Sequence, residues 1–253
     1  AAGAEQEENQ IGGGDERNAR EGGSGMELDA RLRAVAALVP TGCRVADIGT
    51  DHAYLAMHLW QTGRLSGVIA ADKNEGPCRS ARRTLSAAGL TMDIPVRQGD
   101  GLLVLAPGEA DVACIAGMGG ALIIAILAAA PEVLRTLRRL ILQPMNDAPL
   151  LRRWLYEHHW HLAAETLAEA DGRLYEILAA EPGAVSLPEP GLLLIGPCLW
   201  EKKPPLLKKH IESLLLKAHR AAAGMEQSPA AMTREEYRKC KAEIAALEAK
   251  RIW

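Results

Sequence analysis

Apolar positions along the chain follow two periods, one typical of buried strands and one typical of helices. Apolar runs occur at residues 45–48 (interrupted only by Asp47), 68–71, 112–116 and 140–142, and a weaker strand pattern covers 94–98. Stretches with helical spacing alternate with them, at residues 28–39, 53–61, 77–88, 121–139 (with a break at Pro131) and 150–158. Continuously apolar strands that alternate with helices are typical of a parallel sheet covered on both faces. The pattern predicts a doubly wound α/β fold.

Two later strand patterns predict a hairpin. They cover residues 161–168 and 174–180, and Glu169-Ala170-Asp171-Gly172 between them is a turn signal. A hairpin that follows five such strands matches the Rossmann-like architecture of class I methyltransferases. We therefore expect a seven-stranded mixed sheet.

The last part of the chain has a different pattern. Prolines and glycines between residues 182 and 197 predict a linker. Beyond it, apolar positions recur at heptad spacing in two stripes: Leu207, Ile211, Leu214, Ala218 and Ala221, then Tyr237, Cys240, Ile244 and Leu247. Gly224 and Pro229 separate the stripes, so the pattern predicts an antiparallel helical hairpin with a coiled-coil-like seam. Its role is open between a stabilising cap and an arm that grasps the substrate.

These patterns divide the chain into three parts. Residues 1–25 are polar, acidic and rich in glycine, which predicts a disordered leader or a remnant of an expression vector, with Met26 as the expected start. Residues 26–184 form the expected methyltransferase domain. Residues 185–253 form the linker and an all-α C-terminal hairpin domain.

The charge distribution and the cysteines bear on the binding partner and the cellular location of the protein. Residues 200–253 hold 12 basic and 7 acidic side chains, which is compatible with a nucleic-acid partner. The five cysteines are scattered without a C-x-x-C pair, which argues against a disulfide framework or a zinc site and predicts a cytoplasmic location. The uncharged stretch 112–131 is interrupted by Gly117-Met118-Gly119-Gly120, so we expect no membrane span.

The residues after the first strand argue against a dinucleotide cofactor. The sequence there is Asp47-Ile48-Gly49-Thr50-Asp51-His52-Ala53-Tyr54. It has only the first glycine of the G-x-G-x-x-G pattern, because Asp51 and Tyr54 stand at the other two glycine positions. A carboxylate at a phosphate-cradling position would repel a pyrophosphate. A cationic sulfonium cofactor without phosphate suits Asp47 and Asp51 better.

Acidic or small residues follow the next three strands as well. Asp72 lies 23 residues beyond Gly49, where a carboxylate can accept hydrogen bonds from both ribose hydroxyls. Gly99-Asp100-Gly101 offers an acceptor for an adenine amino group, and Ala116–Gly120 offers a floor of small residues. A single Asp at a strand end is more often a helix cap. Four such positions after four consecutive strands predict one S-adenosylmethionine site.

The same motifs resemble those of bacterial tRNA (adenine-22-N1)-methyltransferases. The resemblance covers residues 28–253 and rests on Asp47–Leu55, Gly99–Leu102, Ile115–Gly120, Leu140–Pro144, Arg152, Trp154, Leu155 and Tyr175–Ile177. The chain departs from the family's usual residues at Thr50, Ala56 and Met145, where Ser, Pro and Asn are usual, and Asn146 is expected to replace the last of these. The resemblance implies that S-adenosylmethionine is the cofactor and that N1 of adenine 22 in tRNA is methylated. The expected cofactor-binding residues are Asp47, Gly49, Thr50, Asp51, Asp72, Lys73, Asp100, Gly101, Ala116, Gly117, Met118 and Gly119.

Methylation at adenine N1 needs alignment more than a strong base, because that nitrogen is already nucleophilic. The product base is cationic, so a nearby carboxylate or carbonyl would stabilise the transition state. Since N1 faces the interior of folded tRNA, the base is expected to flip out. The residues expected to handle it are Asp51, His52, Tyr54, Gln143 and Asn146. Helix capping by His52 and helix packing by Tyr54 are equally open.

Basic side chains supply the expected phosphate contacts of the tRNA. The candidates are Arg79, Arg82, Arg83, Arg138, Arg139, Arg152, Arg153, Lys202, Lys203, Lys208 and Lys209. For any one of them, a solvated helix face is a slightly better explanation.

Three functions are open from the residues. A tRNA N1-adenine methyltransferase is favoured, with neither a metal nor a membrane as partner. A methyltransferase of a small molecule or a protein would use the hairpin as a lid or dimer contact. A non-catalytic, methyltransferase-like RNA-binding module is disfavoured by the intact acidic and glycine positions.

Overall fold

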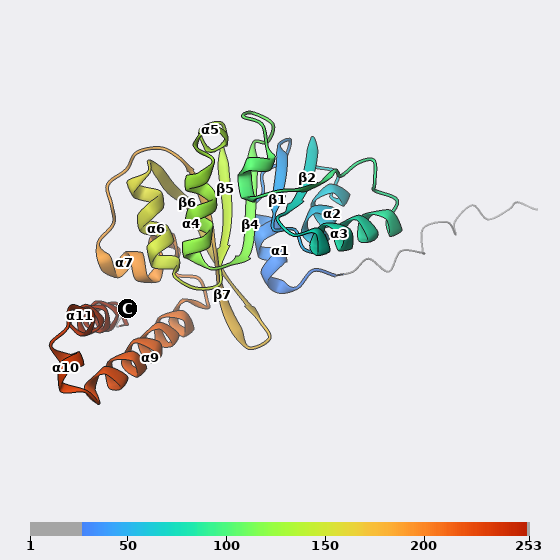
Figure 1. Ribbon diagram of the computed structural model, residues 1–253. Coiled ribbons are helices and arrows are strands. Elements are labelled where there is room, and N and C mark those ends of the chain that lie inside the picture. Colours follow the sequence, from blue (N-terminus) through green and yellow to red (C-terminus); the bar gives the residue numbers. More distant parts are fainter. Residues whose placement is uncertain (1–26, 252–253) are drawn as a thin grey trace, which may run out of the picture.

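The computed structural model describes residues 27–251. The leader predicted at residues 1–25 and the expected start at Met26 lie outside the described residues. The strands are β1 (Arg44–Ile48), β2 (Gly67–Asp72), β3 (Val96–Gln98), β4 (Val112–Met118), β5 (Arg139–Pro144), β6 (Trp160–Ala170) and β7 (Arg173–Pro182). They form one seven-stranded sheet in the order β3-β2-β1-β4-β5-β7-β6 (Figure 1). The first five strands are parallel and β7 is antiparallel to both of its neighbours, so the predicted mixed sheet is confirmed.

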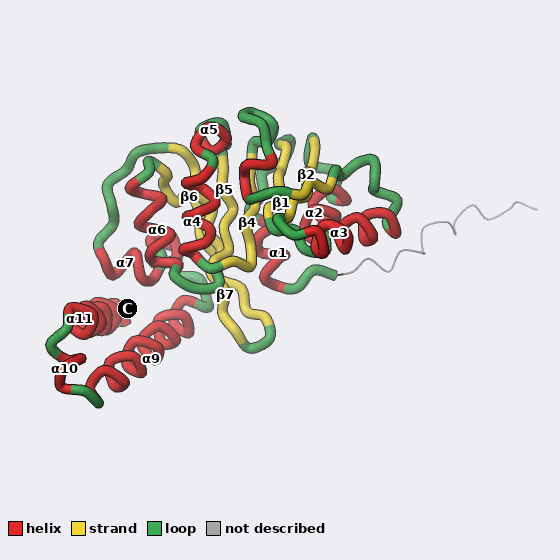
Figure 2. Tube along the Cα trace, viewed as in Figure 1, coloured by secondary structure: helices red, strands yellow, loops and turns green. Residues whose placement is uncertain are grey.

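Helices cover both faces of this sheet (Figure 2). One face packs against α1 (Ala30–Ala37), α2 (Tyr54–Gln61) and α3 (Glu75–Ala87). The other packs against the 3₁₀ turn η1 (Gly101–Val104), α4 (Gly120–Ala129), α5 (Pro131–Leu134) and α6 (Ala148–Glu157). Because apolar side chains meet helices on both faces, the sheet strands are apolar at successive positions, as the sequence pattern indicated.

The helical stretch predicted at 121–139 is shorter in the structure. Helix α4 ends at Ala129, and Pro131 occupies the first turn of α5, where its missing N–H costs nothing. The polypeptide then turns, and Arg139 already belongs to β5. The predicted break at Pro131 is confirmed, whereas the helical assignment of residues 135–139 was wrong.

The β6–β7 hairpin projects from the same edge of the sheet as the carboxyl ends of the parallel strands. Asp171 and Gly172 form its two-residue turn with φ of 50° and 71°, as the predicted turn signal requires. Strand β6 is parallel to β5, because both are antiparallel to β7. The turn that follows β6 therefore lies at the carboxyl edge (Figure 1).

Two short helices form within the predicted linker. They are α7 (Pro190–Ile195) and α8 (Pro197–Lys202), each with a proline in its first turn. Helices α9 (Leu207–Glu226), α10 (Pro229–Met232) and α11 (Glu235–Arg251) follow. Leu207, Ile211, Cys240, Ile244 and Leu247 of the two stripes are buried together, so the predicted helical hairpin forms. At the far end of α9, Ala222 is buried and Ala221 is exposed, one position away from the expected stripe.

A buried ionic cluster joins α6 and α7 to strands β6 and β7. The guanidinium of Arg152 in α6 is fully buried and donates to Glu165 Oε1 at 2.7 Å, to Glu176 Oε2 and to the carbonyl of Leu193 at 3.0 Å. The carbonyl belongs to the end of α7, where helix carbonyls need donors. Arg152 was predicted to contact tRNA, and this was wrong because a fully buried, fully paired side chain presents no charge to a phosphate.

No helix within residues 27–251 is both long and apolar enough to cross a membrane.

Candidate active site

A cavity of about 210 Å³ opens at the carboxyl ends of the parallel strands. Its lining is Ile48, Gly49, Ala71, Asp72, Lys73, Asn74, Gly99, Asp100, Gly101, Met118, Leu122 and Ile126. The lining includes six of the expected cofactor-binding residues, namely Gly49, Asp72, Lys73, Asp100, Gly101 and Met118. The structure thus brings the ends of β1, β2, β3 and β4 to one place, as the positions of the motifs predicted.

The apolar wall of this cavity was not anticipated from the sequence. Leu122 and Ile126 lie one turn apart on α4, and Ile48 is the last residue of β1. The sequence did hold a signal for Leu122 and Ile126. They are four residues apart in a helix that begins at the glycine loop, and residues i and i+4 share one helix face.

The loop after β1 is tight because several residues adopt left-handed backbone conformations. Gly49 has φ of 79°, and a Cβ there would overlap the methyl group of Met118. Asp51 and Ala53 also have positive φ, at 51° and 59°, which is uncommon for residues with a side chain. This geometry lets α2 begin at Tyr54 immediately behind the cavity.

Asp47 lies beneath this loop rather than in the cavity lining. Its carboxylate is buried, and Oδ2 accepts a hydrogen bond of 2.7 Å from the Thr50 hydroxyl. Burial raises the pKa of Asp47 to about 6, although the bond from Thr50 opposes the shift. Within the described residues no cation pairs with it. A buried carboxylate without a paired cation favours a cationic ligand close by.

Two carboxylates face the cavity itself. Asp72 Oδ1 accepts from the backbone N–H of Asn74 at 2.9 Å, which leaves Oδ2 available. Asp100 Oδ2 accepts from Lys73 Nζ at 2.8 Å, which leaves Oδ1 available. Lys73 was predicted as a cofactor contact, and the structure pairs it with the second of these acids. Both acids therefore keep an oxygen that can accept a hydrogen bond from a ligand.

Gly101 gives the ligand room on the α4 side. Its φ is 55°, and a Cβ there would lie 2.7 Å from a side-chain carbon of Ile126. Gly99 is equally constrained, because a Cβ would lie 2.5 Å from Val104. The Gly99–Gly101 sequence thus allows a turn that places Asp100 at the mouth of the cavity.

Gln143, predicted to handle the base, is fully buried at the end of β5. Its Oε1 accepts from Arg31 Nη1 at 2.8 Å and from the Gly117 backbone at 3.0 Å, while Nε2 donates to the Pro144 carbonyl at 2.9 Å. A side chain with all of these bonds and no exposed surface cannot contact a substrate base. The structure contradicts that role and makes Gln143 a support of the glycine loop.

Arg31 is the residue of this site that sequence reasoning missed. It lies on α1, 112 positions before Gln143, with its side chain only 21% exposed. Its guanidinium also lies over the Tyr175 ring, with Cζ 5.8 Å from the ring centroid. No local pattern reveals such a contact, because the two segments meet only through the order of strands in the sheet.

Asn146 is exposed on the loop after β5. Its Oδ1 accepts from the Gly120 backbone N–H at 3.2 Å, and a Cβ at Gly119 would lie 2.9 Å from the same oxygen. The side chain thereby caps the start of α4. Its amide nitrogen has no partner among the described residues and can donate to a base.

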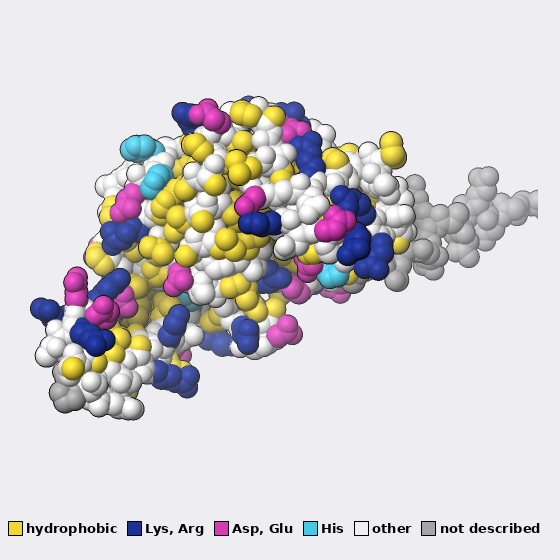
Figure 3. Space-filling view, viewed as in Figure 1, with side chains coloured by type: hydrophobic (Ala, Val, Ile, Leu, Met, Phe, Trp, Pro, Cys, Tyr) yellow, Lys and Arg dark blue, Asp and Glu magenta, His cyan; other side chains and the backbone are white. Residues whose placement is uncertain are grey.

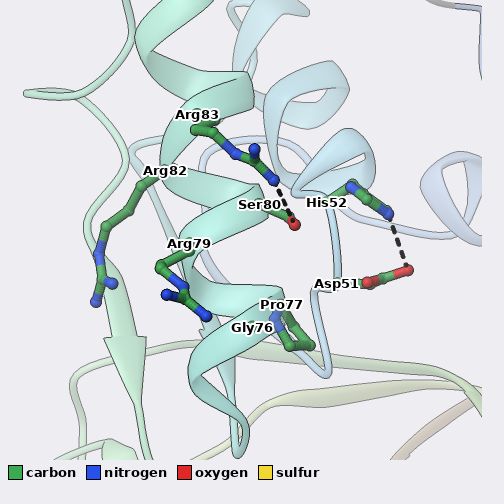
Figure 4. A pocket seen from close by; sticks show the side chains of 8 residues that line it. All are labelled: Asp51, His52, Gly76, Pro77, Arg79, Ser80, Arg82 and Arg83. Carbon is green, nitrogen blue, oxygen red and sulfur yellow. Dashed lines mark hydrogen bonds and ion pairs between the residues drawn. The ribbon is translucent and has the colours of Figure 1, made fainter.

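Asp51, His52 and Tyr54 do not line the 210 Å³ cavity. The rings of His52 and Tyr54 stack with centroids 5.3 Å apart, and His52 Nε2 lies 3.6 Å from Asp51 Oδ2. Asp51 and His52 line a groove of about 740 Å³, whose other wall is α3 (Figure 4). Arg79, Arg82 and Arg83 belong to this wall, which makes the groove predominantly basic.

The other residues predicted to contact tRNA lie in different parts of the structure. Arg138 and Arg139 lie at the amino end of β5, on the opposite edge of the sheet from the cavity, and Arg139 also pairs with Glu181. Arg153 is half exposed near Glu157. Lys209 Nζ bonds Glu169 at 2.6 Å, whereas Lys202 and Lys208 are exposed. Lys203 lies over the Trp200 ring. In the view of Figure 3, dark blue side chains gather over α3 and on the lobe formed by the C-terminal helices.

The chemistry of the cavity fits S-adenosylmethionine. The free oxygens of Asp72 and Asp100 suit ribose hydroxyls and an adenine amino group, and the Leu122–Ile126 wall suits an apolar ring. The buried carboxylate of Asp47 suits a cationic group. No group of three His, Cys, Asp or Glu side chains in residues 27–251 is arranged to hold a metal ion.

Comparisons with known proteins agree with this site. Residues 28–178 match the family described as "Methyltransferase domain". The tRNA (adenine(22)-N(1))-methyltransferase of Bacillus subtilis is 42% identical over 222 residues, which are 85% of this chain and 92% of that protein. The crystal structure of the B. subtilis M1A22 tRNA methyltransferase TrmK matches with a TM-score of 0.81 at 36% identity, covering 89% of this chain and 99% of that one. The Streptococcus pneumoniae protein Sp1610, a putative tRNA (m1A22) methyltransferase solved in complex with S-adenosyl-L-methionine, matches with a TM-score of 0.76 at 34% identity, covering 89% and 100%.

Proposed function

Because the chain belongs to the family of tRNA (adenine(22)-N(1))-methyltransferases, we propose that it transfers a methyl group from S-adenosylmethionine to N1 of adenine 22 in tRNA. The similarity to the B. subtilis enzyme across nearly its whole length carries this proposal. The cavity supports it, since its donors and acceptors match the cofactor and not a pyrophosphate. The tRNA substrate and five free cysteines support a cytoplasmic location.

The cofactor, when bound, supplies a methyl group on a positively charged sulfur. Asp72 accepts hydrogen bonds from the ribose, and Asp100 with Gly101 receives the adenine. Asp47 lies below Gly49 and Thr50 and balances the cationic part of the cofactor from beneath the loop. The loop after β4 leaves space for a base to approach, because Ala116, Gly117 and Gly119 have small side chains or none.

The reaction moves positive charge from the cofactor to the base. The N1 lone pair forms the new N–CH₃ bond while the S–CH₃ bond breaks, so no proton has to be removed from N1. The task of the protein is therefore alignment and exclusion of water rather than strong base catalysis. Carbonyl oxygens of the glycine loop and the amide of Asn146 are the polar groups placed for this.

Two basic surfaces support tRNA as the substrate. The α3 groove offers Arg79, Arg82 and Arg83 beside Asp51 and His52. The C-terminal helices offer further exposed lysines, among them Lys202 and Lys208. The α3 groove lies at the carboxyl edge of the sheet, since its residues follow β1 and β2, and phosphates next to a bound adenine would pass there.

The direct test is methylation of unmodified bacterial tRNA with radiolabelled S-adenosylmethionine. Primer extension on the product should stop at adenine 22, because a methyl group on N1 blocks base pairing. A tRNA with guanine at this position serves as the matched control and should take up no label. Absence of label from every tRNA tested would refute the proposal.

The cofactor site has a separate test by calorimetry. Asp72→Ala removes charge-assisted hydrogen bonds worth about 1.5–3 kcal/mol each, so affinity for S-adenosylmethionine should fall roughly 100-fold or more. Asp93→Ala removes an exposed carboxylate outside the cavity and should leave the affinity unchanged. Equal affinity of the two variants would remove Asp72 from the site.

A further inference from the structure

A cleft of about 490 Å³ separates the loop after β5 from helices α9 and α11. One wall is the segment from Pro144 to Leu150, and the β6–β7 hairpin contributes Arg173 to Glu176. The opposite wall comes from α9 and α11. In Figure 3 the surface is hollowed between the main body and the lobe formed by these helices. Its volume lies in the range of about 300–1,000 Å³ typical of ligand sites.

The cleft and the cofactor cavity are bordered by neighbouring segments of the chain. Met118 lines the cavity, and its carbonyl accepts from the Met145 backbone N–H at 2.8 Å. Asn146, the next residue, lines the cleft and caps α4 through Gly120. The loops after β4 and β5 therefore stand between the two spaces and are hydrogen-bonded to each other.

Three cations line the cleft. Arg173, Lys217 and Lys239 are exposed, and they form no ion pair within residues 27–251. Three acids also line it, but Glu176 is already paired with Arg152, which leaves Asp147 and Glu243. The three unpaired cations, rather than a net positive charge of the lining, are the groups that can contact phosphates of a ligand.

An aromatic ring lies among these cations. Tyr175 of β7 is half-buried in the cleft, and Arg31 lies over its ring. Grooves that combine cations with aromatic rings are typical of sites for single-stranded nucleic acid, where the cations follow the backbone and the rings contact bases.

Buried contacts fix the width of the cleft. Arg152 links α6, which follows the loop on one wall, to Glu165 of β6, Glu176 of β7 and the end of α7. His210 of α9 adds a contact to the Ile195 carbonyl at 3.0 Å. Helix α11 is held in turn through Lys250 and Glu189, 2.6 Å apart. The two walls therefore form one unit, and the cleft is present before a ligand binds.

We propose that this cleft binds the single-stranded nucleotides beside the target adenine after that base has left its stack. This inference rests on the proposed function. It places in the cleft the strand that is left unpaired when the target base is extruded. Arg173 and Lys217 contact two phosphates of that strand, and Asn146 lies at the junction with the extruded base.

The salt dependence of tRNA binding tests this assignment. Each phosphate contact to a single strand contributes about 0.7 to the slope of log K against log salt concentration. Arg173→Ala and Lys217→Ala should each reduce the slope by about 0.7, and the double variant by about 1.4. Arg64→Ala is the matched control, because Arg64 is exposed just before the amino end of β2 and lines neither the cleft nor the α3 groove. It should leave the slope unchanged.

Cofactor affinity, measured in the same variants, should equal that of the unaltered protein, since neither residue lines the cofactor cavity. Slopes and KM for tRNA that match the unaltered protein in both cleft variants would overturn the inference while tRNA methylation itself persists. Failure of the unaltered protein to methylate tRNA would instead refute the proposed function. The two failures are therefore distinguishable.

Discussion

The cofactor cavity and the cleft are bordered by neighbouring segments of the chain, yet different interactions form them. The cavity is formed by short segments directly after strands, with backbone conformations that glycine and a few strained residues provide, such as Gly49 and Asp51. The cleft is formed by side chains from distant segments, such as Arg152 with Glu165 and Leu193. The cavity therefore depends on local chain geometry, and the cleft depends on buried electrostatics.

The largest expected effect comes from breaking the buried cluster. Arg152→Met leaves Glu165 and Glu176 without their cation in a dry environment, and should lower the free energy of unfolding by about 3–5 kcal/mol. Urea unfolding measures this loss. Arg153→Met is the control on the same helix, because its side chain is half exposed and an exposed ion pair contributes about 0–1 kcal/mol.

A second variant separates lost charge balance from lost packing. Adding Glu165→Gln and Glu176→Gln to Arg152→Met removes the uncompensated charges, so much of the stability should return. Equal stability of Arg152→Met and Arg153→Met would show that the cluster does not hold the cleft together.

Sequence reasoning succeeded where the signal is local. The acids after β2 and β3 line the cavity because strand ends in a parallel sheet meet at one edge, so Asp72 and Asp100 were predictable. The hairpin turn at Asp171 and Gly172 was equally local. In both cases a few neighbouring residues determine the geometry.

Sequence reasoning failed where a side chain has a partner far along the chain. Gln143 looked like a base contact, but Arg31, 112 positions earlier, binds its oxygen. Arg152 looked like a phosphate contact, but its partners on β6, β7 and α7 bury it. Nothing near either residue in the sequence reveals the partner, because strand order and not proximity brings the segments together.

A smaller effect is expected from the pH dependence of stability, which tests the burial of Asp47 beneath the loop after β1. The Asp47 pKa is raised from 3.8 to about 6 by burial, so its contribution to stability is complete below about pH 3.8 and is lost as the pH rises through 6. Asp47→Asn has no charge to bury. Without cofactor, the stability of the unaltered protein relative to Asp47→Asn should therefore fall by about 2 kcal/mol between pH 4 and pH 7.

Chemical unfolding across this pH range gives the measurement. Thr50→Val removes the hydroxyl that donates to Asp47 and should move the transition to higher pH. A stability difference that stays constant from pH 4 to pH 7 would show that burial of Asp47 has no such cost.

The smallest expected effect concerns the basic groove on α3. Arg79 and Arg83 are partly free in solvent, and each alanine substitution should raise KM for tRNA about 1.4- to 5-fold, the range of an exposed charge contact of 0.2–1 kcal/mol. Arg138→Ala is the matched control, because Arg138 is highly exposed but lies at the opposite edge of the sheet. Steady-state kinetics at low salt, where screening is weakest, measure all three variants.

Because the α3 groove and the cleft share no lining residue, combining Arg79→Ala with Lys217→Ala should give additive changes in binding free energy. An increase in KM with Arg138→Ala as large as with Arg79→Ala would mean that tRNA responds to total charge rather than to these two surfaces.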